Sequence, residues 1–407
     1  MKFCMVTTFF PPYNMGGDGV YVSRLCEALA RRGHQVDVIH DIDAFRASGG
    51  GQSVGDRALI EGVSVVSLES KYGTLSPLMT HQTGRAWLKA PLKARLEQGG
   101  YDVVHFHNIS LIGLDALGWG QPTVRLMTLH EHWLVCPMSI LWRYDREPCD
   151  EQHCLTCTVR GGRPPQLWRS TNWMHRQLQH LDRVIAPTDF VRRSHLERGL
   201  SLPFEILPHF VPDAVPVASD EVPHARPFFL YSGRLIKAKG VQSLFAAFAR
   251  PGGPDLLIAG DGDYASELRR MAADLPRVVF LGRQSQDALR RLYRHALAVV
   301  VPSMCYEVFG LVVAEALATG TPVVARDQGA LAELVRQSGG GLLFSNDAEI
   351  PAVLDRLAAD PALRTDLATR GREVALQRWS ESAHIESYLR IVDAVAQERR
   401  DGARRTR

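Results

Sequence analysis

Residues 299–325 read VVVPSMCYEVFGLVVAEALATGTPVVA, which is the pattern of a buried strand, a loop, a helix and a second buried strand. The apolar run 297–301 predicts the first strand. A helix is expected to begin near Phe309 and to end at Gly320, because a glycine followed closely by a proline is a stop signal. The second strand is predicted over 322–325, so this stretch is typical of a parallel α/β sheet.

The start of this helix is a candidate ligand site. Gly310 would let the backbone approach a ligand closely, and the unpaired N–H groups of a first helical turn can bind an anion or sugar hydroxyls. Glu307 and Glu315 lie eight residues apart, so they could hold opposite ends of an extended ligand. An ordinary strand-to-helix crossover with a solvated Glu315 also explains the stretch.

Strands alternate with helices in both halves of the chain, which predicts an α/β protein with two doubly wound, Rossmann-like domains facing across a cleft. The chain of 407 residues is too long for one ordinary core. Four prolines in residues 211–227 indicate a linker. We expect an N-terminal domain at 1–212, a C-terminal domain at 213–378, a last helix at 379–396 and a disordered basic tail at 397–407.

The bulk composition describes a soluble globular protein, with 45% hydrophobic and 22% charged residues. A net charge of only +3 argues against a general nucleic-acid binder. The sequence shows neither the pattern of a signal peptide nor an apolar run of 18 residues. We therefore expect a cytoplasmic protein, with weak attraction of the basic tail to anionic lipid headgroups as a route to peripheral membrane association at the inner face.

The N-terminal half opens with a predicted strand at 3–7, a loop containing Gly16 and Gly17, and a helix at 20–32. This loop resembles a phosphate-binding turn, although it lacks the GxGxxG pattern of a dinucleotide site. A long helix is predicted over 84–97. The predicted strand 123–129 delivers His130 at its carboxyl end, where open parallel sheets bind ligands, although a structural histidine would explain that position as well.

A basic loop opens the C-terminal half. The predicted strand 228–231 is followed by Gly233, Arg234 and Lys239, in the run GRLIKAKG. The guanidinium of Arg234 can fork onto phosphate oxygens, and Lys239 can add a point charge. A plain surface loop is the alternative, but beside Glu307 and Glu315 the two cations more naturally clamp a diphosphate.

Four of the seven cysteines fall within 22 residues, in an insertion at about 130–165. In a reducing compartment this clustering fits a structural zinc site better than disulfides, since zinc takes four soft ligands. The spacing contains one CxxC pair and two single cysteines, so four reduced thiols or a redox pair are the alternatives. The candidate ligands are Cys136, Cys149, Cys154 and Cys157.

Taken together, these motifs resemble the retaining, nucleotide-sugar-dependent glycosyltransferases of family 4, which have the two-domain GT-B architecture. The resemblance covers nearly the whole chain. Four signatures occur in order: the Gly16-Gly17 loop, His130, the Gly233 to Gly240 loop, and the two glutamates at positions 307 and 315.

The resemblance implies a role for each matching residue. Arg234 and Lys239 would bind the donor diphosphate, aided by the amides of Gly16 or Gly17, and Gly233 belongs to the same loop. Glu307 would hold the donor sugar, His130 would contact it near the reacting carbon, and Glu315 would hold the ribose. Further donor contacts would come from Gly282 and Arg283 near the nucleobase and from the amides of Phe309, Gly310 and Leu311. Glu131, where the family often has aspartate, receives no role, and the last helix would cross back onto the first domain.

The implied function is transfer of a hexose-type sugar from a nucleotide diphosphate, with UDP or GDP as the leading candidates, to an acceptor hydroxyl. Glycan, glycolipid and secondary-metabolite biosynthesis all remain open. Fixed cations would stabilise the departing diphosphate, so no cofactor is expected for catalysis. The alternatives are a non-catalytic sugar-nucleotide-binding subunit and another GT-B enzyme, such as a sugar-nucleotide epimerase.

If the four clustered cysteines hold zinc, protein purified without chelator will carry close to one zinc per chain in mass spectrometry of the metal content. Replacing Cys154 and Cys157 with serine should release that zinc. Metal-free wild-type protein would remove the idea.

Overall fold

The computed structural model describes residues 1–50, 61–213 and 221–405, so part of the predicted linker lies outside the described residues. The chain forms two compact units. Unit 1 contains 1–139, 153–207 and 384–407, and unit 2 contains 140–152 and 208–383.

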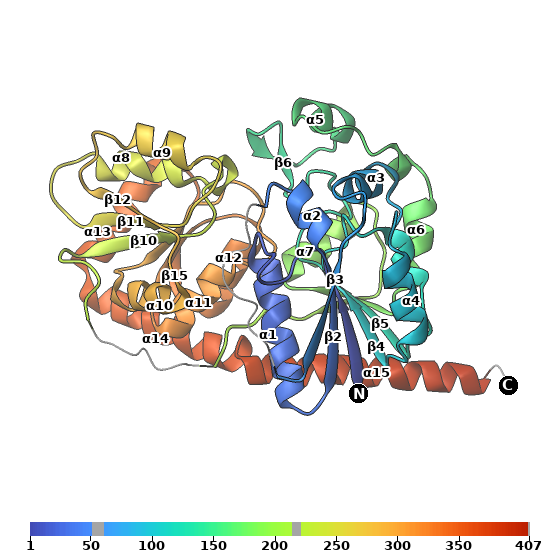
Figure 1. Ribbon diagram of the computed structural model, residues 1–407. Coiled ribbons are helices and arrows are strands. Elements are labelled where there is room, and N and C mark those ends of the chain that lie inside the picture. The colour runs from blue at the N-terminus through green and yellow to red at the C-terminus, as the bar shows by residue number, and fades with distance from the viewer. Residues whose placement is uncertain (51–60, 214–220, 406–407) are drawn as a thin grey trace. The chain divides into compact units, whose positions relative to one another are not determined.

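Unit 1 is built on a seven-stranded parallel sheet (Figure 1). Its strands, in the spatial order β3-β2-β1-β4-β5-β8-β9, are β3 (Val63–Leu68), β2 (Gln35–Asp41), β1 (Lys2–Val6), β4 (Val103–Phe106), β5 (Val124–Thr128), β8 (Arg183–Ala186) and β9 (Phe204–Ile206). Its helices are α1 (Gly17–Arg31), α2 (Ile42–Ala47), α3 (Leu75–Thr83), α4 (Ala90–Gln98), α5 (Cys154–Arg160), α6 (Trp173–Leu178) and α7 (Asp189–Glu197), with 3-10 turns at Leu114–Gly118 and Leu167–Ser170.

Unit 2 has a six-stranded parallel sheet in the order β12-β11-β10-β13-β14-β15. The strands are β10 (Phe228–Ser232), β11 (Asp255–Ala259), β12 (Val278–Gly282), β13 (Val299–Val301), β14 (Val323–Arg326) and β15 (Gly341–Phe344). The helices are α8 (Phe245–Phe248), α9 (Ala265–Met271), α10 (Gln286–His295), α11 (Leu311–Thr319), α12 (Gly329–Ser338), α13 (Ile350–Ala359) and α14 (Pro361–Arg378), with 3-10 turns at Lys237–Lys239, Val241–Leu244 and Asp347–Glu349.

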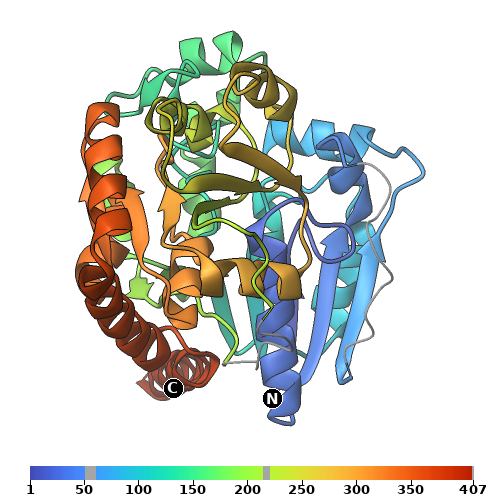
Figure 2. The ribbon, with the colours of Figure 1, turned by 90° about the vertical axis from the view of Figure 1, so that its left-hand side faces the viewer.

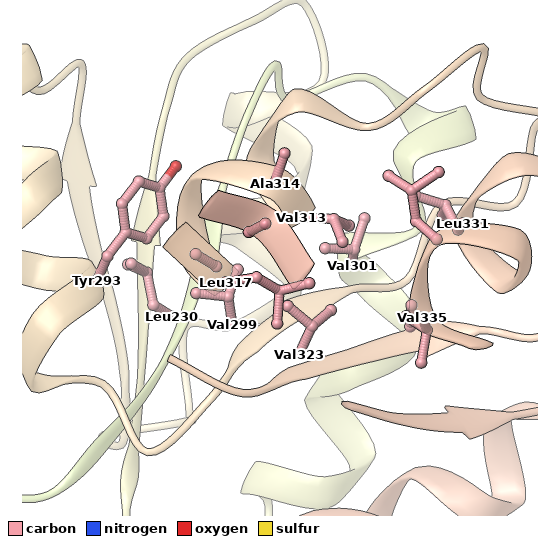
Figure 3. Close-up of a cluster of buried hydrophobic side chains, with 14 of the residues drawn as sticks. Leu230, Tyr293, Val299, Val301, Val313, Ala314, Leu317, Val323, Leu331 and Val335 are labelled. Carbon is pink, nitrogen blue, oxygen red and sulfur yellow. The ribbon is translucent and has the colours of Figure 1, made fainter. Parts of the chain in front are cut away.

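The four inner strands of the unit 2 sheet, β11, β10, β13 and β14, are buried on both faces. Alternate residues of a strand point to opposite sides, so Leu230 packs into one apolar cluster and Phe229 into the other. Figures 1 and 2 show α8 and α9 over one face of this sheet and α10 and α11 under the other. In Figure 3, strand residues such as Val299 and Val323 pack beside Leu317 of α11. Burial on both faces explains why the sequences of these strands are mostly continuous apolar runs.

The chain ends with α15 (Glu381–Arg405), and from His384 onward these residues belong to unit 1. The predicted disordered tail is therefore wrong for the described residues, because the helix continues to Arg405. Arg399 pairs with Asp182 at 2.8 Å, and Arg183 pairs with Glu398 at 2.5 Å. These ion pairs hold the basic end of the chain against unit 1.

Two further expectations from the sequence are corrected by the structure. The helix predicted over 84–97 begins only at Ala90, as α4, because Gly84 caps the preceding helix α3 in a left-handed conformation (φ 69°) and Pro91 lies in the first turn of α4. The insertion at about 130–165, assigned to the N-terminal domain, is divided. Its residues 140–152, which carry the hairpin of β6 (Trp142–Arg143) and β7 (Glu147–Pro148), group with unit 2.

Gly371 in α14 shows how closely the elements of unit 2 pack. A Cβ at this position would lie 2.6 Å from Leu317 Cδ2 and 2.9 Å from the Cα of Gly340. Gly371→Ala should therefore lower the free energy of unfolding by about 1–3 kcal/mol through overpacking, although alanine favours a helix by up to about 1 kcal/mol. Scanning calorimetry should show a lower transition temperature.

The matched control is Gly402→Ala in α15, where an added Cβ would meet nothing within 4 Å. This variant should keep or slightly raise the transition temperature. A Gly371→Ala protein as stable as the wild type would contradict the packing account.

Candidate functional site

Two loops of unit 2 lie side by side at the carboxyl edge of its sheet. Loop 233–240 follows β10 and loop 302–310 follows β13, and these strands are neighbours in the sheet. The backbone N–H groups of Met304 and Cys305 donate to the carbonyl of Ala238 at 2.8 and 3.2 Å. The two loops are therefore joined by main-chain hydrogen bonds.

Gly240 permits this close approach. Its φ is 73°, and a Cβ there would lie 2.2 Å from the carbonyl oxygen of Pro302. No other residue type would fit without moving the two loops apart.

Lys239 and Glu307 form an ion pair between the two loops, and both side chains are partly buried. Ser303 Oγ donates to Glu307 Oε1 at 2.6 Å. Burial opposes the charge of Glu307, but Lys239 and Ser303 outweigh it and hold the pKa of the carboxyl below its ordinary value. Burial likewise opposes the charge of Lys239, whose pKa is nevertheless raised, chiefly by Glu307. Both groups are therefore charged at neutral pH.

Arg234 lies in the same loop but makes a different contact. Its side chain is 47% exposed, and its Nη2 lies 3.6 Å from Oδ2 of Asp263. Tyr231 donates its hydroxyl to the Arg234 carbonyl at 2.9 Å, which fixes the backbone at Gly233 and Arg234. The guanidinium itself is accessible to an anion.

The helix expected to begin near Phe309 begins at Leu311, as α11. Gly310 is the residue before the helix and has a φ of 96°, followed by Leu311 as the first helical residue. Phe309 is buried and packs edge-on against Trp379, with ring centroids 5.9 Å apart. The helix N-terminus is thus held by the core of unit 2.

Glu315 and the Gly282-Arg283 pair are placed by other elements of unit 2. Tyr293 of α10 donates its hydroxyl to Glu315 Oε2 at 3.3 Å. Gly282 ends β12 with a φ of 68°, so Arg283 follows at the carboxyl edge of the sheet. The structure therefore brings Lys239 and Glu307 into direct contact, while Glu315, Gly282 and Arg283 lie on separate strand or helix ends of the same unit.

Unit 1 carries the remaining predicted residues. Gly16 precedes α1 in an extended conformation, and Gly17 is the first residue of that helix. His130 lies two residues beyond the end of β5, with its Nε2 3.0 Å from Nδ1 of His107. Burial lowers the pKa of His130 to about 3, so the imidazole is neutral at physiological pH.

Glu131 follows this histidine in the chain, and the carboxylate of Asp18 influences its pKa. The pKa of Glu131 is raised to about 7, first by burial and then by the charge of Asp18, which together outweigh the hydrogen bonds from Ser139 and Ser110. The pKa of Asp18 is itself raised by burial. Asn108 Nδ2 donates to Asp18 Oδ2 at 3.2 Å.

Several of these side chains were missed by the sequence analysis. Ser303 supports Glu307, and Gln328 Nε2 donates to the carbonyls of residues 303, 304 and 305 at 2.9–3.2 Å. Asn108 supports Asp18. Each of these three residues, like His130, lies two residues beyond the end of a parallel strand. The sequence could have indicated Ser303, Gln328 and Asn108 by this spacing.

The clustered cysteines are all in the reduced form. Cys136, Cys154 and Cys157 belong to unit 1 and Cys149 to unit 2. Within the described ranges, no group of three or more His, Cys, Asp or Glu side chains is arranged to hold a metal ion. The zinc site therefore stays a prediction, to be tested by metal analysis. The described helices include none with the length and apolarity that a membrane crossing requires.

Comparison with known proteins matches both halves of the chain to family models. Residues 15–215 match the model described as Glycosyltransferase Family 4, and residues 218–374 match Glycosyl transferases group 1. A glycosyltransferase of Methanocaldococcus jannaschii is 26% identical over 413 residues, which cover 93% of this chain and 95% of that protein.

Solved structures share the fold. The sucrose-phosphate synthase of Thermosynechococcus elongatus superposes with a TM-score of 0.70 at 22% identity, covering 100% of this chain and 99% of that one. HepE of Anabaena, solved in complex with UDP-glucose, has a TM-score of 0.62 at 19% identity, with 99% of each chain covered. With its two parallel-sheet Rossmann-like domains and matching family models in both halves, the chain belongs to the family 4 glycosyltransferases of GT-B fold.

Proposed function

We propose that this glycosyltransferase moves a hexose from a nucleotide diphosphate-sugar to an acceptor hydroxyl with retention of anomeric configuration. The observation that carries the proposal is the Lys239–Glu307 pair, held between two adjoining loops at the carboxyl edge of the unit 2 sheet. In open parallel sheets this edge is where nucleotides bind.

The donor diphosphate is proposed to bind at Lys239 and Arg234. Breaking the glycosyl–phosphate bond builds negative charge on the departing diphosphate, so a fixed cation stabilises the transition state more than the ground state. Lys239 is charged and aligned by Glu307 before the donor arrives, which avoids reorganisation during the reaction. These two cations can supply the charge stabilisation that a metal ion would otherwise give, so we propose that catalysis needs no metal cofactor.

Glu307 is proposed to position the donor sugar rather than to attack it. Its carboxylate already accepts hydrogen bonds from Lys239 and Ser303, and these partners lower its basicity. A glycosidase-type mechanism would need a second carboxylate placed about 5–10 Å away across the scissile bond. In the proposed retaining reaction, the departing phosphate accepts the proton of the acceptor hydroxyl on the same face of the sugar.

Glu315 is proposed to bind the ribose of the donor. The amides of Gly310 and Leu311 are proposed to bind the hydroxyls of the donor hexose. UDP or GDP is the proposed nucleotide of the donor, and the UDP-glucose complex of HepE is consistent with the first of these. The proposed acceptor binds unit 1, where the neutral imidazole of His130 would act as a hydrogen-bond partner near the reacting carbon and not as a cation. Seven reduced cysteines fit the cytoplasm as the proposed location.

A thermal-shift panel of UDP-, GDP-, dTDP- and ADP-sugars tests the proposed donor class. A ligand that binds only the folded protein raises its stability with the logarithm of its excess over Kd. We expect one nucleotide series to raise the melting temperature well above the others. Equal, negligible shifts for all four would oppose the proposal.

Lys239→Ala should lower the rate of donor hydrolysis by about 10²–10³-fold, by analogy with the loss of one preorganised donor to a developing negative charge. Glu315→Gln should instead weaken donor binding and raise KM. Lys93→Ala on α4 is the control, since it removes one lysine charge from an exposed pair with Glu97 in unit 1. Wild-type turnover in a Lys239→Ala, Glu315→Gln double variant would contradict the proposed donor site.

The raised pKa of Glu131 gives a prediction on stability. The folded protein holds this proton more tightly than the unfolded chain does, so the stabilisation is complete below about pH 4.5 and is lost as pH rises through about 7. Melting temperatures measured between pH 5 and pH 8 should therefore fall less in Glu131→Gln than in the wild type. Glu61→Gln, at an exposed position, is the control and should show the same pH dependence of melting temperature as the wild type. The same pH dependence in Glu131→Gln would contradict this account.

A further inference from the structure

A short hairpin from the middle of the chain packs on the two loops of the proposed donor site. Residues 140–152 belong to unit 2, although the chain on both sides of them belongs to unit 1. Strands β6 and β7 of this hairpin pair in antiparallel register, Trp142 with Pro148 and Arg143 with Glu147. The family resemblance assigns no role to these residues.

Trp142 lies at the centre of this contact. Its side chain is 4% exposed and packs with Ala238 and Cys305, each 3% exposed. Three more apolar residues complete the cluster, namely Ile140, Ile236 and Met304. Ala238 immediately precedes Lys239, and Cys305 lies two residues before Glu307. The indole therefore covers the junction at which the two loops are hydrogen-bonded through the Ala238 carbonyl.

Polar contacts at the rim of the hairpin reach the same two loops. Asp145 Oδ2 lies 3.2 Å from Lys237 Nζ in the first loop. Asp150 Oδ1 accepts a hydrogen bond of 3.2 Å from the Tyr306 hydroxyl in the second. Asp145 and Lys237 are both well exposed, so their ion pair should contribute little. The buried indole is the main link between the hairpin and the loops.

The contribution of Trp142 is apolar packing. Its Nε1–H is buried and has no hydrogen-bond partner among the described residues. The hairpin backbone around it is also unusual, since Leu141, Tyr144 and Asp145 have positive φ angles of 47°, 55° and 56°. Such conformations persist in non-glycine residues only where surrounding contacts enforce them.

We propose that Trp142 is a positioning residue of the donor site, which sets the separation of loops 233–240 and 302–310 and through them the Lys239–Glu307 geometry. The inference rests on the proposed function for its effect on donor binding. Removing the indole leaves a gap between the hairpin and both loops. The loops then sample more conformations, and the cation and carboxylate are no longer aligned in advance.

The experiment compares Trp142→Ala with Trp142→Phe in the full-length protein. Hydrogen exchange of loops 233–240 and 302–310, measured without ligand, reports loop order directly. Calorimetric titration with UDP-glucose and GDP-mannose then reports donor binding. We expect faster exchange in both loops and a donor Kd roughly tenfold higher in Trp142→Ala, with Trp142→Phe close to the wild type because a ring without the N–H fills most of the same space.

Leu357→Ala is the matched control, since Leu357 is fully buried in α13 of the same unit. It should lower stability as a core truncation does while leaving exchange of the two loops and the donor Kd unchanged. If Trp142→Ala does not fold, Trp142→Leu goes through the same measurements. The Leu357→Ala control separates an effect on loop position from general destabilisation of the fold.

Unchanged exchange in both loops of the folded Trp142→Ala or Trp142→Leu protein would overturn the proposal, as would an equal effect in Leu357→Ala. A wild-type protein that binds neither sugar nucleotide would instead count against the proposed donor class, and the exchange result would then decide the role of Trp142 by itself.

Discussion

The close approach of loops 233–240 and 302–310 is the constraint on which the candidate site depends. Because β10 and β13 are neighbours in a parallel sheet, the loops that follow them leave the same edge together. Gly240 allows the main chains to meet, and the Ala238 carbonyl binds two amides of the second loop. Lys239 and Glu307 are consequently brought together by the backbone and do not depend on their own attraction to meet.

This arrangement also explains how a partly buried ion pair can be tolerated. Taking two charges out of water costs free energy that their attraction recovers only when the geometry is good and other hydrogen bonds are made. Ser303 supplies such a bond to Glu307. A charged lysine held in this way is ready for an anionic ligand, and exchanging a carboxylate partner for phosphate oxygens requires no change of its protonation state.

Much of the fold could be predicted from the sequence because strands buried on both faces are continuous apolar runs. The strands predicted over 228–231 and 322–325 are observed as β10 (Phe228–Ser232) and β14 (Val323–Arg326) for this reason. The helix predicted over 84–97 was placed six residues too early, because Gly84 is the left-handed residue that ends α3 and α4 begins at Ala90. The tail was read from its charge, although its acidic and basic side chains pair with Asp182 and Arg183 of unit 1.

Only some residues of the candidate site could be predicted from the sequence. Residues within recognisable motifs, such as Lys239 and Glu307, could be found, and the structure places those two in contact. Ser303 and Gln328 act by hydrogen bonds across loops that only the folded chain brings together. The role of Trp142 could not be foreseen either, because local sequence gives no sign that residues 140–152 pack on unit 2.

The most direct test of the central claim is a crystal structure of the protein with an intact sugar nucleotide, UDP-glucose or GDP-mannose. The account predicts that the diphosphate lies between Arg234 and Lys239, with Lys239 Nζ on a phosphate oxygen, Glu307 facing the hexose and Glu315 facing the ribose. A diphosphate bound elsewhere, with the Lys239–Glu307 pair undisturbed, would contradict it.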